Sequence, residues 1–281
     1  MRLLLCTDLD RTLLPNGPQP ESPLARKRFS LLAARDEVTL VYVTGRHQAL
    51  VQQAIRNYQL PQPDFVIADV GSTIYQLRGD NWIHWQAWEN EIASDWNNKT
   101  HDDLQLLLKQ FSDLRVQEMS KQNTHKLSYY IPLYVDHSVL IEKIKHCFEQ
   151  QNIHANLIWS VDEPANIGLL DILPASAGKR HAIEFLMQAL DFDYDEAVFA
   201  GDSGNDISVL ASAIQSVLVA NASDDVRKSA VQQARINGQQ KSLYLARGDS
   251  LGMNGNYSAG IIEGVIYYMP AAEDWIGLDD E

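Results

Sequence analysis

The chain has 281 residues, of which 45% are hydrophobic and 21% charged, a composition typical of a globular protein with a large buried core. Its formal net charge of −14 at pH 7 argues against nucleic acids and anionic membranes as partners, because both would be repelled. Two cysteines cannot form a disulfide framework, and the N-terminal apolar run is too short for a signal peptide or a membrane span, so we expect a cytoplasmic protein.

The first part of the chain alternates between strand and helix patterns. Short apolar or β-branched runs predict strands at residues 3–6, 38–43 and 65–68, with helices at about 24–34 and 47–58 between them. Strands separated by helices in this rhythm indicate β-α-β units and a parallel sheet.

The composition of the sequence changes at about residue 78. From there to residue 167 the chain is rich in Trp, Asn, Gln and His. It carries helix patterns near 101–114 and 138–151, and an alternating strand pattern at 126–131. We predict a separate α+β insert in this segment.

The first rhythm returns after the insert. Patterns predict a strand at residues 169–173, a helix at 177–190, and strands at 197–200 and 216–220. The sequence therefore predicts an α/β protein whose parallel sheet is interrupted by the insert.

Two carboxylates directly follow the first predicted strand. Asp8 and Asp10 have one residue between them, and at the C-terminal end of a parallel strand both can reach the crevice where open α/β sheets bind ligands. One carboxylate can attack phosphorus while the other supplies and removes a proton. The alternative is a turn with helix-capping aspartates, which Asp-x-Asp alone does not distinguish from a catalytic pair.

A second acidic group follows the strand at 197–200. Asp202 and Asp206 are four residues apart with Asn205 between them, and Gly201 allows the backbone to turn tightly. The carboxylates can then converge on a hard cation that prefers oxygen ligands. The alternative is a surface loop rich in Asn, Asp and Gly.

Two further segments offer groups for a phosphate. Thr44, Gly45 and Arg46 follow the second strand, where a hydroxyl and free backbone N–H groups can bind phosphate, although a helix cap explains Thr44 equally well. Lys179 begins a helix and can reach phosphate as a point charge, although most lysines in such places are merely solvated. All four segments follow strands of one predicted sheet, so their side chains would gather at one edge and supply what phosphoryl transfer needs.

The order of these motifs resembles the haloacid dehalogenase superfamily of phosphatases. The matching residues are Asp8-x-Asp10-x-Thr12, Thr44, Lys179 and Gly201-Asp202-x-x-x-Asp206. Residues 42–46, 70–75, 126–129 and 201–207 are similar to the sucrose-phosphate phosphatase group, and the resemblance extends to about Ala222. It implies a Rossmann-like core domain with a parallel sheet, formed by residues 1–77 and 173–281, and an inserted α+β cap domain at 78–172.

The resemblance also implies a role for each catalytic residue. Asp8 would be the nucleophile that becomes an aspartyl-phosphate, and Asp10 would protonate the leaving sugar oxygen and then activate water. Thr44 and Lys179 would hold the transferring phosphoryl group.

The same resemblance implies a metal site and a substrate site. Mg²⁺ would be bound by Asp202, Asp206, a carboxylate oxygen of Asp8 and the backbone carbonyl of Asp10. The expected substrate-binding residues come from the phosphate loops, the third strand's turn and the cap: Gly45, Arg46, Gly71, Ser72, Lys126, Ser128, Tyr129 and Asn205.

The leading interpretation is a phosphatase of sucrose 6-phosphate, with Mg²⁺ as cofactor. A mannosylfructose, glucosylglycerol or trehalose phosphate is the alternative substrate, since the Gly-rich stretch at 247–256 departs from the relatives and could reshape the pocket. A non-catalytic sugar-phosphate-binding partner of a synthase is the alternative from another class. The tryptophans of the insert could stack on a sugar or pack the cap against the core: Trp82, Trp85, Trp88 and Trp96.

Overall fold

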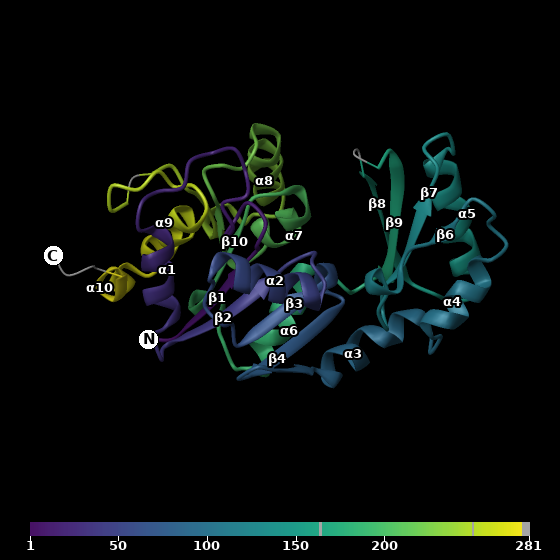
Figure 1. Ribbon diagram of the computed structural model, residues 1–281, viewed down its shortest axis with the longest axis horizontal. Helices are drawn as coiled ribbons and strands as arrows, with labels where there is room; N and C mark the ends of the chain where they lie inside the picture. Colours follow the sequence, from purple (N-terminus) through teal and green to yellow (C-terminus); the bar gives the residue numbers. More distant parts are fainter. Residues whose placement is uncertain (163–164, 249, 277–281) are drawn as a thin grey trace.

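The computed structural model describes residues 1–162, 165–248 and 250–276. Its main element is an eight-stranded sheet in the order β12-β11-β10-β1-β2-β3-β4-β5 (Figure 1). The strands are β1 (Leu3–Thr7), β2 (Val38–Val43), β3 (Phe65–Ala68), β4 (Thr73–Arg78), β5 (Asn81–His84), β10 (Ala197–Gly201), β11 (Gln215–Leu218) and β12 (Leu243–Leu245). β4 and β5 run antiparallel to their neighbours and the other six are parallel, as the β-α-β rhythm predicts.

Helices cover both faces of this sheet. Leu3 and Leu5 of β1 lie on one face of the sheet. The hydrophobic cluster on that face also contains residues of α1 (Ala25–Ala33), α2 (Gln48–Tyr58), α9 (Ser258–Tyr268) and α10 (Glu273–Ile276). Leu4 and Cys6 face the other side, with α3 (Gln86–Ala93), α6 (Lys179–Ala189), α7 (Ile207–Leu210) and α8 (Asp224–Ile236). Because β1 is buried on both faces, its residues 3–6 form a continuous apolar run and not an alternating one.

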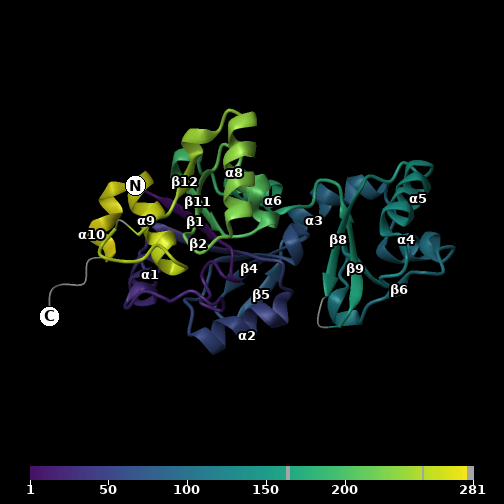
Figure 2. The same ribbon diagram turned by 90° about the horizontal axis from the view of Figure 1, so that it is seen from above.

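A smaller antiparallel sheet forms a second lobe, which lies beside the first in two perpendicular views (Figures 1 and 2). Its strands, in the order β6-β7-β9-β8, are β6 (Arg115–Val116), β7 (Leu127–Ile131), β9 (Ile167–Pro174) and β8 (Ala155–Asp162). One face packs on α4 (His101–Leu108) and α5 (His137–Glu149) around a separate hydrophobic cluster that includes Trp96 and Phe148. α3 and the segment from β9 to α6 connect the lobes (Figure 1).

Two sequence-based boundaries differ from the structure. The strand at 169–173 was expected in the returning parallel rhythm, but β9 lies in the small sheet, antiparallel to β7 and β8. β5 pairs with β4 in the large sheet, so residue 78 is too early a start for the insert. We propose that the cap domain begins after α3, whose Trp88 and Ile92 pack in the core of the large sheet.

The four tryptophans pack within one lobe or the other, and not at the contact between cap and core that one of the two interpretations expects. Trp85 stacks on Phe65 of β3 with ring centroids 5.3 Å apart, and Trp82 meets Tyr75 edge to face. Trp88 and Trp96 are fully buried, in the core and the cap respectively. Within the described ranges, no helix is both long and apolar enough to cross a bilayer.

Candidate active site

Three aspartates converge at the carboxyl edge of the large sheet. Asp8 follows β1, and Asp202 and Asp206 follow β10, the strand that pairs with β1 in parallel. One carboxylate oxygen of each aspartate lies within 4.8 Å of the others, and all three residues are buried. The structure thus brings together two acidic groups that are almost 200 positions apart in the chain.

The turn after β10 fits the carboxylate of Asp206 closely. A Cβ at Gly201 would lie 2.6 Å from the Asp206 Cγ, so any larger residue would displace that side chain. Asp206 Oδ2 accepts hydrogen bonds from the backbone N–H groups of Asp202 and Ser203, at 3.1 and 3.0 Å. One oxygen of Asp206 is therefore fixed by the backbone, while Oδ1 faces the other charged groups.

Lys179 supplies a buried positive charge to this cluster. Its Nζ lies 2.7 Å from Asp206 Oδ1 and 3.2 Å from Asp8 Oδ1, and it donates a hydrogen bond of 3.1 Å to Asn205 Oδ1. Burial by itself would lower the pKa of the ammonium, but Asp206 and Asp8 together raise it well above its usual value. Lys179 is therefore charged, and the expected contact with Asn205 is present.

One lysine does not balance three carboxylates. Burial raises the pKa of Asp8 to about 7; Lys179 opposes that rise and Asp206 adds to it. Burial and the Asp206 charge raise the pKa of Asp202 to about 6, against a hydrogen bond of 3.2 Å from the Thr12 hydroxyl. Converging carboxylate oxygens with excess negative charge are the ligands that a hard divalent cation prefers, so the residues present fit Mg²⁺.

These shifts make the stability of the metal-free protein depend on pH. The pKa values of Asp8 and Asp202 in the folded chain lie above the ordinary value of 3.8. Between the unfolded and folded pKa values the folded state binds more protons, so this contribution to the free energy of unfolding falls as the pH rises from about 4 to about 7. We expect wild type in EDTA to lose melting temperature relative to Asp8→Asn between pH 5 and pH 8.

Magnesium should reverse this trend, because cation binding favours ionised carboxylates. The rise in melting temperature on adding MgCl₂ should be larger at pH 8 than at pH 5 in wild type, and smaller at both pH values in Asp8→Asn. A melting-temperature difference between wild type and Asp8→Asn that does not change with pH would contradict the prediction.

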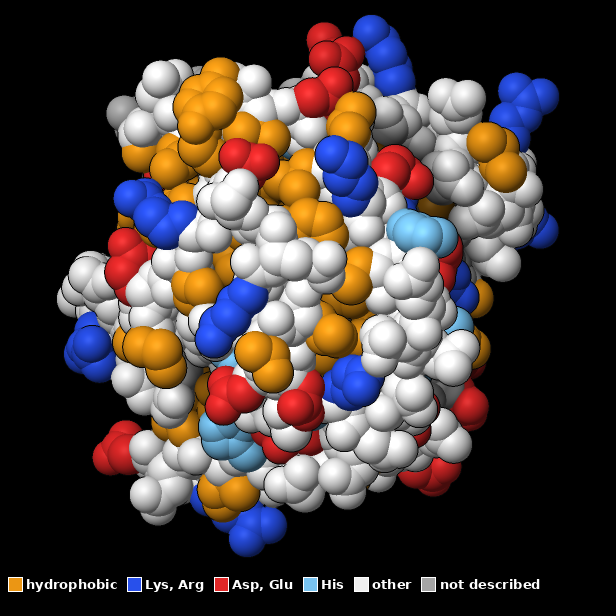
Figure 3. Space-filling model, turned by 90° about the vertical axis from the view of Figure 1, so that its right-hand side faces the viewer, with side chains coloured by type: hydrophobic (Ala, Val, Ile, Leu, Met, Phe, Trp, Pro, Cys, Tyr) orange, Lys and Arg blue, Asp and Glu red, His pale blue; other side chains and the backbone are white. Residues whose placement is uncertain are grey.

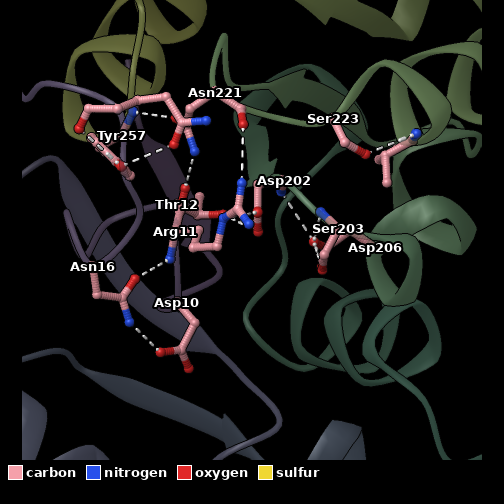
Figure 4. A network of polar contacts seen from close by, with 12 residues as sticks. Asp10, Arg11, Thr12, Asn16, Asp202, Ser203, Asp206, Asn221, Ser223 and Tyr257 are labelled. Atoms are coloured by element: carbon pink, nitrogen blue, oxygen red, sulfur yellow. Dashed lines mark hydrogen bonds and ion pairs between the residues drawn. The ribbon is translucent and has the colours of Figure 1, made fainter. Parts of the chain in front are cut away.

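Asp10 lies apart from the three-aspartate cluster and points away from Asp202 (Figure 4). Arg46 donates two hydrogen bonds to the Asp10 carboxylate, from Nε to Oδ2 at 2.7 Å and from Nη2 to Oδ1 at 2.5 Å. Asn16 donates a third, to Oδ1 at 2.8 Å. Partial burial raises the pKa of Asp10, but these partners outweigh it and hold the pKa below its usual range. Arg46, expected to bind substrate, is here paired with Asp10. The assignment of the Asp10 backbone carbonyl to the metal stays a prediction.

Thr44 occupies the turn between β2 and α2. It is 1% exposed, its N–H donates to the Ile67 carbonyl at 2.8 Å, and its hydroxyl accepts from the Arg46 N–H at 3.2 Å. The helix-cap alternative is wrong, because α2 begins at Gln48 with His47 as its N-cap. Gly45 lies in the same turn.

A hydrogen-bond network that the sequence reasoning missed supports the Asp10 loop (Figure 4). Arg11 has a φ of 58°, and its Nε lies 3.5 Å from Asp202 Oδ2. Asn221 donates to the Arg11 carbonyl at 2.6 Å and accepts from the Tyr257 N–H at 2.8 Å. The only sequence signal was the position of Arg11 between two motif residues.

The predicted cap residues separate into two groups. Lys126 Nζ lies 3.7 Å from Asp69 Oδ1 and 3.5 Å from Asp171 Oδ2, and Ser128 donates to Asp171 Oδ1 at 2.5 Å. Tyr129 instead packs in the hydrophobic cluster of the cap with 3% exposure. Successive strand residues point to opposite faces, so the structure does not bring Tyr129 to the polar face of Ser128.

Gly71 and Ser72 lie between the lobes. A Cβ at Gly71 would come within 2.4 Å of the Gly178 backbone, next to Lys179, so this glycine serves a close approach. The Ser72 hydroxyl accepts a hydrogen bond of 3.2 Å from Asn123 of the insert.

The Gly-rich stretch at 247–256 packs on the loop between β1 and α1. The Asn254 N–H donates a hydrogen bond to the Ser22 hydroxyl at 2.8 Å, and the Asn254 side chain donates one to the Pro20 carbonyl at 2.9 Å. Asp249 of this stretch lies outside the described residues, as do 277–281 of the predicted core domain.

An open groove of about 710 Å³ lies between α5 and the turn that follows α4. α5 is on the side of the cap sheet away from the large sheet (Figure 1). None of the predicted site residues lines the groove. On the surface at that end of the molecule, hydrophobic side chains are scattered among charged ones (Figure 3). We therefore do not assign the groove to the site.

The chain is similar to known hydrolases along most of its length. The model of the sucrose-6F-phosphate phosphohydrolase family matches residues 1–269. A Nitrosococcus oceani protein described as a HAD-like hydrolase is 51% identical over 275 residues, which are 98% of this chain and 74% of that protein. Sucrose-phosphatase 2 of Nicotiana tabacum is 27% identical over 243 residues, which are 84% of this chain and 54% of the plant protein. The chain thus spans about half the length of that relative.

The X-ray structure of the sucrose-phosphatase from Synechocystis in complex with sucrose and phosphate is similar in fold. The TM-score is 0.68 with 24% sequence identity, over 95% of this chain and 98% of that one. The α/β architecture with an added α+β lobe is therefore shared with a solved structure.

Proposed function

Since the chain belongs to the sucrose-6F-phosphate phosphohydrolase family of HAD-like hydrolases, we propose that it is a magnesium-dependent phosphatase of a small sugar phosphate. The observation that carries this proposal is the group of three buried carboxylates within 4.8 Å of one another, joined by the buried Lys179. A phosphoryl group brings further negative charge, so both its binding and its transfer depend on neutralisation at this edge of the sheet.

In the proposed reaction, an Asp8 carboxylate oxygen attacks phosphorus, and the bond from phosphorus to the sugar oxygen breaks. The proton from Asp10 goes to that oxygen, and the sugar leaves as an alcohol. Water then attacks the aspartyl-phosphate, Asp10 takes a proton from the water, and Asp8 is restored with release of phosphate. Bound Mg²⁺ would neutralise charge on the phosphoryl oxygens, held by Asp8, Asp202 and Asp206.

The Arg46 pair bears on the role of Asp10. Arg46 keeps the pKa of Asp10 low, which favours the carboxylate form that accepts a proton from water in the second step. For the first step Asp10 must carry a proton, so the bidentate pair with Arg46 must open. The anionic ester offers the guanidinium an alternative partner, which is how Arg46 would take part in substrate binding.

We propose sucrose 6-phosphate as the substrate, supported by the family match along residues 1–269. Lys126, Ser128 and Asp171 form a polar group in the cap that can pair with sugar hydroxyls, and Ser72 lies on the core side. A mannosylfructose, glucosylglycerol or trehalose phosphate would use the same chemistry. Association with a sugar-phosphate synthase belongs to the same proposal.

A panel of esters tests this function. We expect Mg²⁺-dependent phosphate release from p-nitrophenyl phosphate, and faster release from sucrose 6-phosphate than from trehalose 6-phosphate. EDTA should abolish phosphate release from all three esters. If wild type releases phosphate from every ester no faster than Asp8→Asn does, the chain is a binding protein and the phosphatase proposal is wrong. If another sugar phosphate is the best substrate, only the choice of sugar is wrong.

A further inference from the structure

The segment that joins β3 to β4 has an unusual backbone. Three of its four residues, Asp69, Val70 and Gly71, have φ values of 51°, 62° and 97°. A positive φ is costly for a β-branched residue such as Val70, and such strain persists only where the surroundings hold it in place. The strained turn is therefore held by specific contacts.

Those contacts go to both phosphate-binding segments. The Asp69 N–H donates to the Arg46 carbonyl and the Val70 N–H to the Thr44 carbonyl, each at 3.1 Å. Gly71 abuts the Gly178 backbone at the start of α6, immediately before Lys179. A displacement of this turn would therefore displace the segments that carry Thr44 and Lys179.

The Asp69 side chain faces the cap. Its carboxylate is buried, and burial raises its pKa despite the attraction of Lys126, 3.7 Å away on the cap side. Asn123 of the insert donates to the hydroxyls of Ser72 and Thr73, at 3.2 and 3.3 Å. The strained turn thus contacts the cap on one side and the phosphate-binding segments on the other.

Lys126 is the cap residue at the centre of this contact. It lies between the carboxylates of Asp69 and Asp171, at 3.7 and 3.5 Å. Both distances exceed the roughly 2.7–2.9 Å of a charge-assisted hydrogen bond, so these ion pairs leave the ammonium able to donate to a ligand hydroxyl. A sugar that engages Lys126 would change the interaction of Lys126 with Asp69.

We propose that Asp69 is a positioning residue, which through Lys126 couples sugar binding in the cap to the placement of Thr44 and Lys179. This inference rests on the proposed phosphatase function. The role is separate from sugar recognition as such, because Asp69 acts on the phosphate-binding segments through its backbone. Sugar binding would then raise kcat as well as affinity.

A double-mutant cycle tests the coupling, with Asp69→Asn, Lys126→Met and the double variant. The substrates are the fastest sugar phosphate of the panel above and p-nitrophenyl phosphate, which has no sugar to engage the cap. We expect each single variant to lower kcat for the sugar phosphate about 5- to 150-fold, the range of typical coupling between sites, with a smaller loss on the aryl ester. The double variant should be no slower than the slower single variant, because both break the same link.

Asp171→Asn is the matched control. It also removes a carboxylate beside Lys126, but Asp171 belongs to the cap strand β9 and not to the strained turn. We expect it to raise KM more than it lowers kcat. If Asp69→Asn gives the same pattern as Asp171→Asn, or if the losses of the two single variants multiply in the double variant, the coupling role is wrong.

Further outcomes distinguish the coupling role from a purely structural role of Asp69 and from a failure of the phosphatase proposal. Equal losses on the sugar and aryl esters would mean that Asp69 only maintains the fold, which also overturns the inference. If Asp69→Asn does not fold, Lys126→Met breaks the same pair from the cap side, and an unchanged kcat for the sugar phosphate in it would refute the coupling. Absence of any Mg²⁺-dependent turnover in wild type would instead refute the phosphatase proposal.

Discussion

Asp8→Asn should abolish phosphate release while the fold survives. Asparagine has nearly the same shape as aspartate but cannot attack phosphorus, and loss of a nucleophile costs at least about 10⁴-fold in kcat. Because burial raises the pKa of Asp8 to about 7, its charge is unfavourable in the metal-free fold at pH 8, so we expect no loss of melting temperature in EDTA. Steady-state phosphate release and thermal unfolding measure the two effects.

A covalent intermediate provides an independent measurement for the same variant. Rapid acid quenching during turnover should trap a phosphoprotein in wild type and none in Asp8→Asn, as read by mass spectrometry. Asp36→Asn, an exposed aspartate before β2, is the matched control and should leave rate and stability unchanged. A wild-type rate in Asp8→Asn would show that another group attacks phosphorus.

Lys179→Met should lower both activity and stability. The ammonium lies 2.7 Å from Asp206 and 3.2 Å from Asp8, and its loss leaves buried carboxylates without a direct cation. Removal of one partner of a buried ion pair costs about 3–5 kcal/mol in the free energy of unfolding. Removal of a group that neutralises the transition state costs about 10²- to 10³-fold in kcat. Urea unfolding in EDTA and phosphate release with Mg²⁺ measure the two losses.

The magnesium dependence of the Lys179→Met defect distinguishes its causes. Mg²⁺ should restore part of the lost stability, because the cation offsets the same carboxylates, but it should not restore the rate. Lys241→Met, at an exposed lysine, is the control for loss of a positive charge and should change neither. A free energy of unfolding equal to that of wild type in EDTA would mean that the pair contributes nothing to the fold.

The core motifs could be predicted because they depend on local features. Asp8 and Asp202 each directly follow a short, fully buried strand of mostly apolar residues, and such strands can be predicted from sequence as members of a parallel sheet. Since parallel strands of one sheet end at the same edge, the sequence predicts that Asp8, Asp202 and Asp206 lie on one side of the sheet. Their approach to within 4.8 Å also requires β1 and β10 to be neighbours, which only the structure shows.

The hydrogen-bond and ion-pair partners of the site residues could not be predicted from sequence in this way. Arg46 could be placed near the phosphate site but not assigned to the carboxylate of Asp10, and Asp69 carried no motif that distinguished it from an ordinary turn aspartate. The Lys126 ion pairs join residues more than 40 positions apart, one in the other lobe (Asp69) and one within the cap (Asp171). Such pairs form because packing within and between the lobes brings the groups together, so no local pattern encodes them.

The cap shows most clearly which features local sequence predicts and which features depend on tertiary packing. Alternation in residues 126–131 identified a strand, and a period of two implies that Ser128 and Tyr129 point to opposite faces. Which of those faces is covered by α4 and α5 depends on the order of the small sheet and on β9, which appeared from sequence to return to the large one. Element type and the edge that carries the chemistry follow from short-range pattern, whereas the choice of face, neighbour and ion-pair partner is made when the hydrophobic surfaces pack.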